Sequence, residues 1–289
     1  MSHYIEVEKN VKLFVEDIGE GTPIVFIHGW PLNHTMFEYQ FTQLTQEGYR
    51  CIGIDLRGYG KSDCSLEGYS YDRMADDIRA VIDELQLDNI ILVGFSVGGA
   101  ISIRYMSKHS EYNVDKLVLV GAAAPVFTQR DNYVYGHTLQ EINDMIEAIH
   151  LDRPKMVADF GQKFLENEVS APFSIWLNAL GLEASAHGTI RLLESLRDED
   201  LREDLGQIHV PTAIFHGELD KICPFVFAEM MNEEIEGSKL IPFNESGHGL
   251  LFDEKEKFNQ ELKAFLELNR VKVKPISRWN DDGGSQPEV

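Results

Sequence analysis

One serine lies between glycines in a pattern suited to nucleophilic catalysis. Residues 94–98 read Gly-Phe-Ser-Val-Gly, after an apolar run at 89–93 and before an apolar segment at 99–105. The flanking glycines suit a strand-to-helix turn too tight for a Cβ, which would expose the hydroxyl of Ser96 at the carboxyl edge of a sheet. The amide of Val97, at the start of the helix, could stabilise an oxyanion. We therefore predict a nucleophilic Ser96; the alternative is an ordinary serine in a glycine-rich turn.

A nucleophilic serine needs a general base, and that base needs a carboxylate to orient it. Of the ten histidines, His248 has the most suitable position, between glycines in a loop that follows the last predicted strand. Asp220, in the loop after the preceding strand, is the predicted acid. Glu218 is its competitor, but it lies nearer the strand and should point away in the tight turn. The order Ser96, Asp220, His248 matches neither of the two common serine-protease orders. A purely structural role for His248 is the alternative.

A second oxyanion donor is expected in the loop after the third predicted strand, where residues 26–31 read Phe-Ile-His-Gly-Trp-Pro. The amide of Trp30 is the predicted donor, and Gly29 would allow close backbone approach. We expect His28 to support this loop rather than act as a base or ligand. No spacing of histidines and carboxylates resembles a zinc site, so we predict no metal.

Apolar residues near these positions could form a pocket for a short acyl or aryl group. Each of them could equally be part of the core. Besides Trp30 and Val97, the predicted pocket residues are Pro31, Phe95, Phe127, Trp176, Phe225 and Leu250.

The elements that must position these residues follow from the hydrophobic pattern. Alternating runs at 4–8 and 11–16 predict an antiparallel hairpin. Later apolar runs alternate with helical segments, which predicts a parallel sheet from the third strand onward. These strands are expected at 24–27, 51–54, 89–93, 116–120, 212–215 and 239–242, with helices at 36–47, 71–85 and 253–268.

A long helical insertion interrupts this rhythm. We predict a cap over residues 123–206, above a core made of residues 1–122 and 207–270. Such a cap would lie over the carboxyl ends of the strands and exclude water from the reaction; a role in packing alone is the alternative. Residues 271–289 are polar and lack periodicity, so we expect a mobile tail.

Composition limits the classes of partner. The formal net charge of −22 argues against binding to nucleic acid or to an anionic membrane. Three cysteines (Cys51, Cys64 and Cys223) with no C-x-x-C spacing fit a reducing compartment. The first residues lack the pattern of a signal peptide, and no apolar run is long enough for a membrane span, so we expect a cytoplasmic protein.

Several segments together resemble the cofactor-free haloperoxidases and aryl esterases of the α/β-hydrolase superfamily: 28–33, 48–50, 55–62, 75–77, 94–99 and 247–249. The resemblance implies the α/β-hydrolase fold, with a mostly parallel sheet, an N-terminal antiparallel hairpin, helices on both faces and a helical cap. It also implies a serine esterase without cofactor that accepts hydrogen peroxide in place of water and so forms a peracid. Many relatives carry methionine or threonine where this chain has Val97, and relatives with aspartate at the position of Ser96 are dehalogenases and epoxide hydrolases.

The expected partners are therefore a small ester and hydrogen peroxide. Two other functions use the same residues: a small-molecule receptor whose triad turns over slowly, and a carbon–carbon bond hydrolase or lyase. Assembly into a homo-oligomer stays open.

Overall fold

The structure is a computed structural model that describes residues 1–268. Its eight-stranded sheet has the order β1-β2-β4-β3-β5-β6-β7-β8. The pairs β1–β2 and β2–β4 are antiparallel, and every pair from β3 to β8 is parallel, which confirms the predicted topology. The strands are β1 (Ser2–Glu8), β2 (Val11–Gly19), β3 (Thr22–Ile27), β4 (Tyr49–Ile54), β5 (Ile90–Phe95), β6 (Val114–Val120), β7 (Thr212–Gly217) and β8 (Lys239–Phe243).

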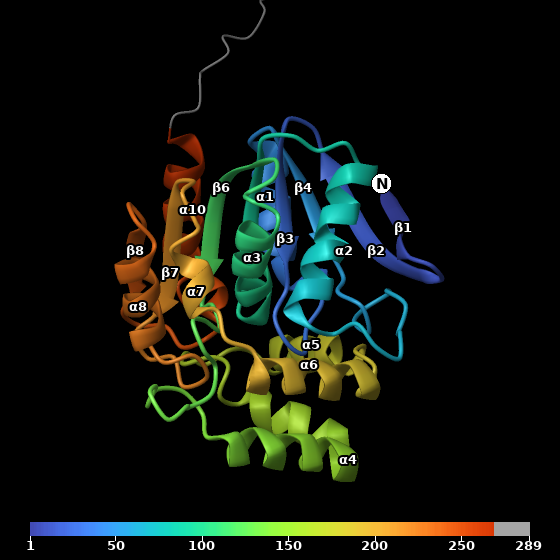
Figure 1. Cartoon of the computed structure of the whole chain (residues 1–289), viewed down its shortest axis with the longest axis vertical. Helices are drawn as coiled ribbons and strands as arrows, with labels where there is room; N and C mark the ends of the chain where they lie inside the picture. Colours follow the sequence, from blue (N-terminus) through green and yellow to red (C-terminus); the bar gives the residue numbers. More distant parts are fainter. Residues whose placement is uncertain (269–289) are drawn as a thin grey trace, which may run out of the picture.

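Helices cover both faces of this sheet. Figure 1 shows α2 (Tyr71–Glu84) and α3 (Val97–Lys108) in front of it. Behind it, α1 (Glu38–Gln46) and α10 (Lys255–Glu267) are joined by a 3.0 Å hydrogen bond between Gln40 and Asn259. The side chain of Ser70 caps α2, whose apolar side packs into the core as its helical period predicts. The central strands are consequently buried on both faces, as their continuous apolar sequences require.

The final predicted helix differs from the expectation of one helix over 253–268. The structure has α9 (Leu250–Asp253) and α10, separated by Glu254 with φ −118° and ψ 52°. The carboxylate of Glu254 accepts hydrogen bonds from Glu245 N at 3.0 Å and Ser246 Oγ at 2.6 Å. These bonds to the preceding loop hold Glu254 in a non-helical conformation, so the helix is interrupted at this residue. The expected helix at 36–47 likewise begins as a short 3₁₀ turn, η1 (His34–Phe37).

Between β6 and β7 the chain forms α4 (Leu139–Gly161), α5 (Ala171–Leu182), α6 (Ala186–Asp198) and α7 (Arg202–Leu205). Figure 1 shows α4, α5 and α6 below the sheet, at the end toward which the arrow of β6 points. These helices therefore lie at the carboxyl edge of the strands, where the predicted site residues also lie. Across residues 1–268, no helix combines the length and apolar character needed to cross a membrane. The predicted tail at 271–289 is outside the described residues.

Candidate active site

Ser96 lies on a sharp, strained turn between β5 and α3. Its φ of 55° and ψ of −121° fall in a region that residues with a side chain rarely adopt, at a cost of about 1–3 kcal/mol. The flanking glycines explain why the turn closes: a Cβ at Gly94 would lie 2.5 Å from Gly98 O, and one at Gly98 would lie 2.3 Å from Ile27 O. The strain places the predicted nucleophile at the end of the sheet, next to the cap.

His248 and Asp220 meet beside this turn. Nδ1 of His248 lies 2.7 Å from Oδ2 of Asp220, and the imidazole is fully buried. The ring centroids of His248 and Phe95, which precedes Ser96, are 4.8 Å apart. Within residues 1–268, Nε2 of His248 is buried and has no hydrogen-bond partner, so it is not bonded to Ser96 in this arrangement. Such bonds are often formed only when substrate is bound.

The second oxygen of Asp220 is fixed by the backbone. Oδ1 accepts hydrogen bonds from Ile222 N and Cys223 N, each at 2.8 Å. Burial by itself raises the pKa of the Asp220 carboxyl, but His248, His216 and the Cys223 amide outweigh it and hold that pKa below its ordinary value. The carboxylate therefore stays ionised and can stabilise an imidazolium. The competitor Glu218 is exposed, whereas the hydrogen-bond partner of His248 Nδ1 is Asp220.

His216 is a site residue that the sequence analysis did not single out. It is fully buried on β7, its Nε2 donates to Cys223 O at 2.7 Å, and the same nitrogen lies 3.5 Å from Oδ2 of Asp220. Burial lowers its pKa, so it is neutral beside the acid. The thiol of Cys223 is also buried, and burial raises its pKa well above the ordinary value, which makes it a poor nucleophile.

The loop after β3 packs directly against Ser96. A Cβ added at Gly29 would lie 2.9 Å from the Cβ of Ser96, so glycine is required for this close approach. The indole of Trp30 is held by a 3.0 Å hydrogen bond to Thr189 O of the cap, and the Trp30–Pro31 peptide bond is cis. Neither Trp30 N nor Val97 N donates a hydrogen bond to another group of residues 1–268. Both amides are thus free to bind a negatively charged oxygen.

His28 supports the same loop from behind. Its Nε2 accepts a hydrogen bond from Leu56 N at 3.0 Å, and its Nδ1 lies 3.0 Å from Gly29 O and donates to it. Together the two contacts require the neutral imidazole, because a proton added to Nε2 would face the Leu56 N–H. Burial lowers the pKa of His28 from 6.5 to about 4, although Asp55 opposes the shift.

This pKa predicts a loss of stability in acid. The folded protein binds the His28 proton only near pH 4, whereas the unfolded chain binds it below about pH 6.5, so the stabilisation is complete above pH 6.5 and is lost as the pH falls toward 4. We expect His28 to account for up to about 3 kcal/mol of that loss. Urea unfolding of the wild type and of His28→Gln at pH 7 and pH 4.5 measures the difference. If the free energy of unfolding fell equally in the two proteins between pH 7 and pH 4.5, the result would contradict this role of His28.

The predicted pocket residues lie at different distances from the site. Pro31 lines a small cavity between the Trp30 loop and the cap, together with Leu32, Val157, Phe160, Gly161, Phe164, Leu177, Asn178 and Gly181. Phe95 contacts His248, Phe225 contacts His216, and Leu250 is fully buried in α9. Trp176 packs on Phe173 and Phe252, and Phe127 packs on His137. The cavity is about the size of one water molecule, so it has no room for a substrate in this arrangement.

Phe160 and Phe164 belong to the cap and were not predicted. The ring of Phe160 meets the indole of Trp30 edge to face at 4.8 Å, and the ring of Phe164 meets His248 at 5.5 Å. Their sequence segment shows only a helical pattern, so nothing in it indicates which aromatic residue reaches the site.

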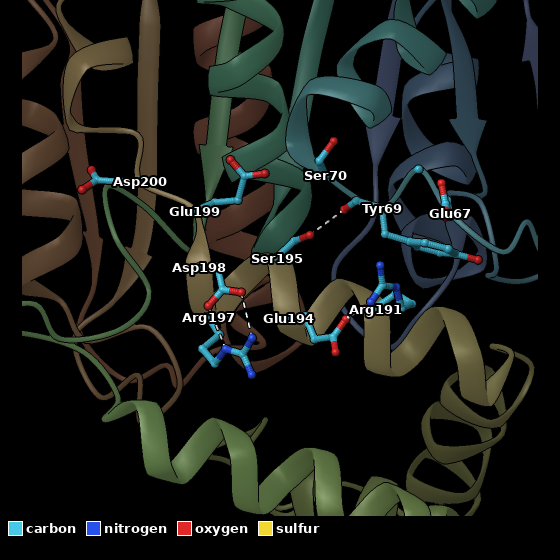
Figure 2. A pocket seen from close by; sticks show the side chains of 11 residues that line it. Glu67, Tyr69, Ser70, Arg191, Glu194, Ser195, Arg197, Asp198, Glu199 and Asp200 are labelled. Atoms are coloured by element: carbon cyan, nitrogen blue, oxygen red, sulfur yellow. Dashed lines mark hydrogen bonds and ion pairs between the residues drawn. The ribbon is translucent and has the colours of Figure 1, made fainter.

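A larger cavity lies elsewhere, at the outer seam between α6 and the core. It has a volume of about 610 Å³ and is lined by charged and polar side chains, among them Arg191, Glu194 and Asp198. Figure 2 shows Ser195 of α6 bonded across this seam to Tyr69 O, at 2.8 Å. This cavity is separate from the candidate active site, because Ser96, Asp220 and His248 do not line it.

Comparisons with known proteins identify the family to which this fold belongs. A family model described as alpha/beta hydrolase fold matches residues 22–255. The AB hydrolase superfamily protein YisY of Bacillus subtilis (strain 168) is 56% identical over 265 residues, which cover 92% of this chain and 99% of that protein. An esterase from Exiguobacterium antarcticum has 51% identity and a TM-score of 0.91, over 92% of this chain and 100% of that one. A bromoperoxidase from Bacillus anthracis has 32% identity and a TM-score of 0.89, with the same two coverages.

Proposed function

The chain belongs to the alpha/beta hydrolase fold family, and we propose that it is a serine hydrolase that cleaves small carboxylic esters through an acyl-enzyme. The observation that carries this proposal is the buried pair of His248 and Asp220, 2.7 Å apart, beside a serine on a strained turn. The similarity to a solved esterase supports the same reaction class. We further assign residues 1–122 and 207–268 to the catalytic core and 123–206 to the cap; positions 269 and 270 of the expected core lie outside the described residues.

In the proposed reaction, Ser96 Oγ attacks the ester carbonyl while Nε2 of His248 takes its proton. Asp220 keeps the imidazole in the required tautomer and stabilises the imidazolium that forms. The amides of Trp30 and Val97 bind the oxyanion of the tetrahedral intermediate. His248 then protonates the leaving alcohol, and an acyl group remains on Ser96.

The acyl-enzyme can react with more than one acceptor. Attack by water gives a carboxylic acid, and attack by hydrogen peroxide gives a peracid; both restore the hydroxyl of Ser96. The similarity to a bromoperoxidase supports the second reaction, because a peracid can oxidise halide outside the site. Both acceptors are small neutral molecules, which suits the burial of Ser96 and His248.

The test is a rapid-mixing assay with p-nitrophenyl acetate, with and without hydrogen peroxide. We expect a burst of p-nitrophenol equal to the enzyme concentration, then steady turnover that yields acetate or peracetate. An acetyl group on Ser96, detected by mass spectrometry after acid quenching, identifies the intermediate. A single slow turnover would favour a receptor, and no ester cleavage would favour a carbon–carbon hydrolase or lyase; either result would overturn the proposal.

A further inference from the structure

We propose that Asp253 is a positioning residue for this reaction: its carboxylate holds the cap against the loop of His248, so that closing the cap also fixes the imidazole. The inference rests on the proposed function, in which His248 is the general base. Asp253 ends α9, the short helix that directly follows the histidine loop.

The carboxylate of Asp253 joins two parts of the molecule through backbone amides. Its Oδ2 accepts hydrogen bonds from Gly247 N, at 2.9 Å, and from Glu166 N, at 3.1 Å. Its Oδ1 accepts a third from Asn167 N, at 3.0 Å. One of these donors belongs to the histidine loop and two belong to the cap. Amide bonds to a carboxylate are stronger than neutral ones, so this link is a strong one.

Residues 164–167 of the cap, called the cap segment, contact the histidine loop (residues 244–249) on both sides of the His248 imidazole. On one side the contact passes through Asp253 to Gly247, and on the other Gly249 N donates to Phe164 O at 2.7 Å. A Cβ at Gly249 would lie 2.6 Å from the side chain of Leu165, and one at Gly247 would lie 3.3 Å from Glu166 N. Glycine on both sides of His248 thus lets the cap approach the catalytic loop closely.

The same segment closes the site to solvent. Phe164 is 2% exposed and packs edge to face on His248, at 5.5 Å. Ser96 is 6% exposed and His248 is fully buried, so substrate enters only when this segment moves away. Breaking the bonds to Asp253 is then part of opening, and remaking them is part of closing.

Another part of the cap, helix α6, would stay with the core during such a movement. Helix α6 is fixed to the core by Trp30 Nε1 to Thr189 O at 3.0 Å, by Tyr59 OH to Gly188 O at 3.1 Å, and by the seam contact of Figure 2.

The moving part would instead be residues 153–183. Helix α4 is kinked at Asp152, where φ is −157° and ψ is 80°. The Arg153 guanidinium donates to Ala184 O and Leu182 O, at 3.0 and 3.2 Å, so both ends of this segment lie together, as at a hinge.

Asp253→Asn tests the proposal. The amide group that replaces one oxygen cannot accept a hydrogen bond, so at least one of the three bonds is lost. We expect kcat per active site to fall about 10- to 100-fold, because a misplacement of about 1 Å at a catalytic group can cost about 100-fold in rate. Active sites are counted from the p-nitrophenol burst, which a merely unfolded fraction lowers without changing kcat per site. Hydrogen exchange at the amides of Glu166, Asn167 and Gly247 should become faster.

Two matched variants separate this role from simpler ones. Glu254→Gln disturbs bonds to Glu245 N and Ser246 Oγ within the histidine loop but none to the cap. Lys221→Met removes the exposed ion pair with Glu166, at 2.6 Å, which joins the same cap segment to the core at the surface. We expect less than a threefold change in kcat per site from Lys221→Met, and no faster exchange at Glu166 and Asn167 in Glu254→Gln.

If Asp253→Asn does not fold, Glu166→Pro carries the test, because proline removes one of the two donors on the cap side and leaves the carboxylate intact. The same loss of kcat per site is expected. An unchanged kcat per site in whichever of these two variants folds would overturn the proposal. A wild-type protein that gives no burst would instead overturn the proposed function, so the two failures are distinguishable.

Discussion

Replacing Ser96 with alanine is expected to lower kcat for p-nitrophenyl acetate by about 10⁴- to 10⁶-fold, because it removes the hydroxyl proposed to form the acyl-enzyme. The amides of Trp30 and Val97 would remain, and with them a small residual rate. The burst of p-nitrophenol and the acetylated peptide should both disappear. Steady-state rates and mass spectrometry on the same preparation measure the effect.

A second variant, Ser96→Gly, separates a loss of activity caused by the missing hydroxyl from one caused by unfolding. Ser96 has a φ of 55°, a conformation that glycine adopts without strain and alanine does not. Ser96→Gly should therefore be as inactive as Ser96→Ala but more stable than it, by about 1 kcal/mol in urea unfolding. Retention of more than a hundredth of the wild-type rate in either variant would exclude Ser96 as the nucleophile.

Asp220→Asn should lower kcat by about 10⁴-fold while leaving the fold intact. An asparagine oxygen can still accept from Ile222 N and Cys223 N, which now hold Oδ1 at 2.8 Å. The amide nitrogen would then face Nδ1 of His248, at the 2.7 Å position of Oδ2. It would donate to Nδ1, force the proton onto Nε2, and so remove the base that Ser96 needs. Steady-state kinetics and thermal unfolding test the two halves of this prediction.

Glu218→Gln is the matched control for this change. Glu218 lies two positions earlier on the same loop and is exposed, so its replacement should leave kcat within about twofold of the wild type. If Glu218→Gln lost activity and Asp220→Asn did not, the assignment of the acid would be reversed.

The positions of the strands, the parallel type of the sheet and the position of the tight turn at Ser96 could be predicted from the sequence because they depend on local patterns. Continuous apolar runs separated by helical segments indicate a parallel sheet, and eight strands appear where these runs lie. The glycines around Ser96 indicate a tight turn before any partner is known, and the contacts that a Cβ would make at Gly94 and Gly98 give the reason. Ends of elements were less predictable: the break at Glu254 depends on its bonds to Glu245 and Ser246.

The sequence by itself therefore determined the type of sheet, the turn at Ser96 and the candidates for acid and base, because each of these depends on residues close together in the chain. Only the tertiary structure placed Asp220 against His248, brought Phe164 onto His248, and linked Asp253 to Glu166 and Asn167. The contacts of Phe164 and Asp253 join segments more than 80 residues apart, 87 in the case of Glu166 and Asp253, and even Asp220 and His248 are 28 residues apart. No local pattern encodes such a pairing, because it is set by how the cap packs on the finished sheet.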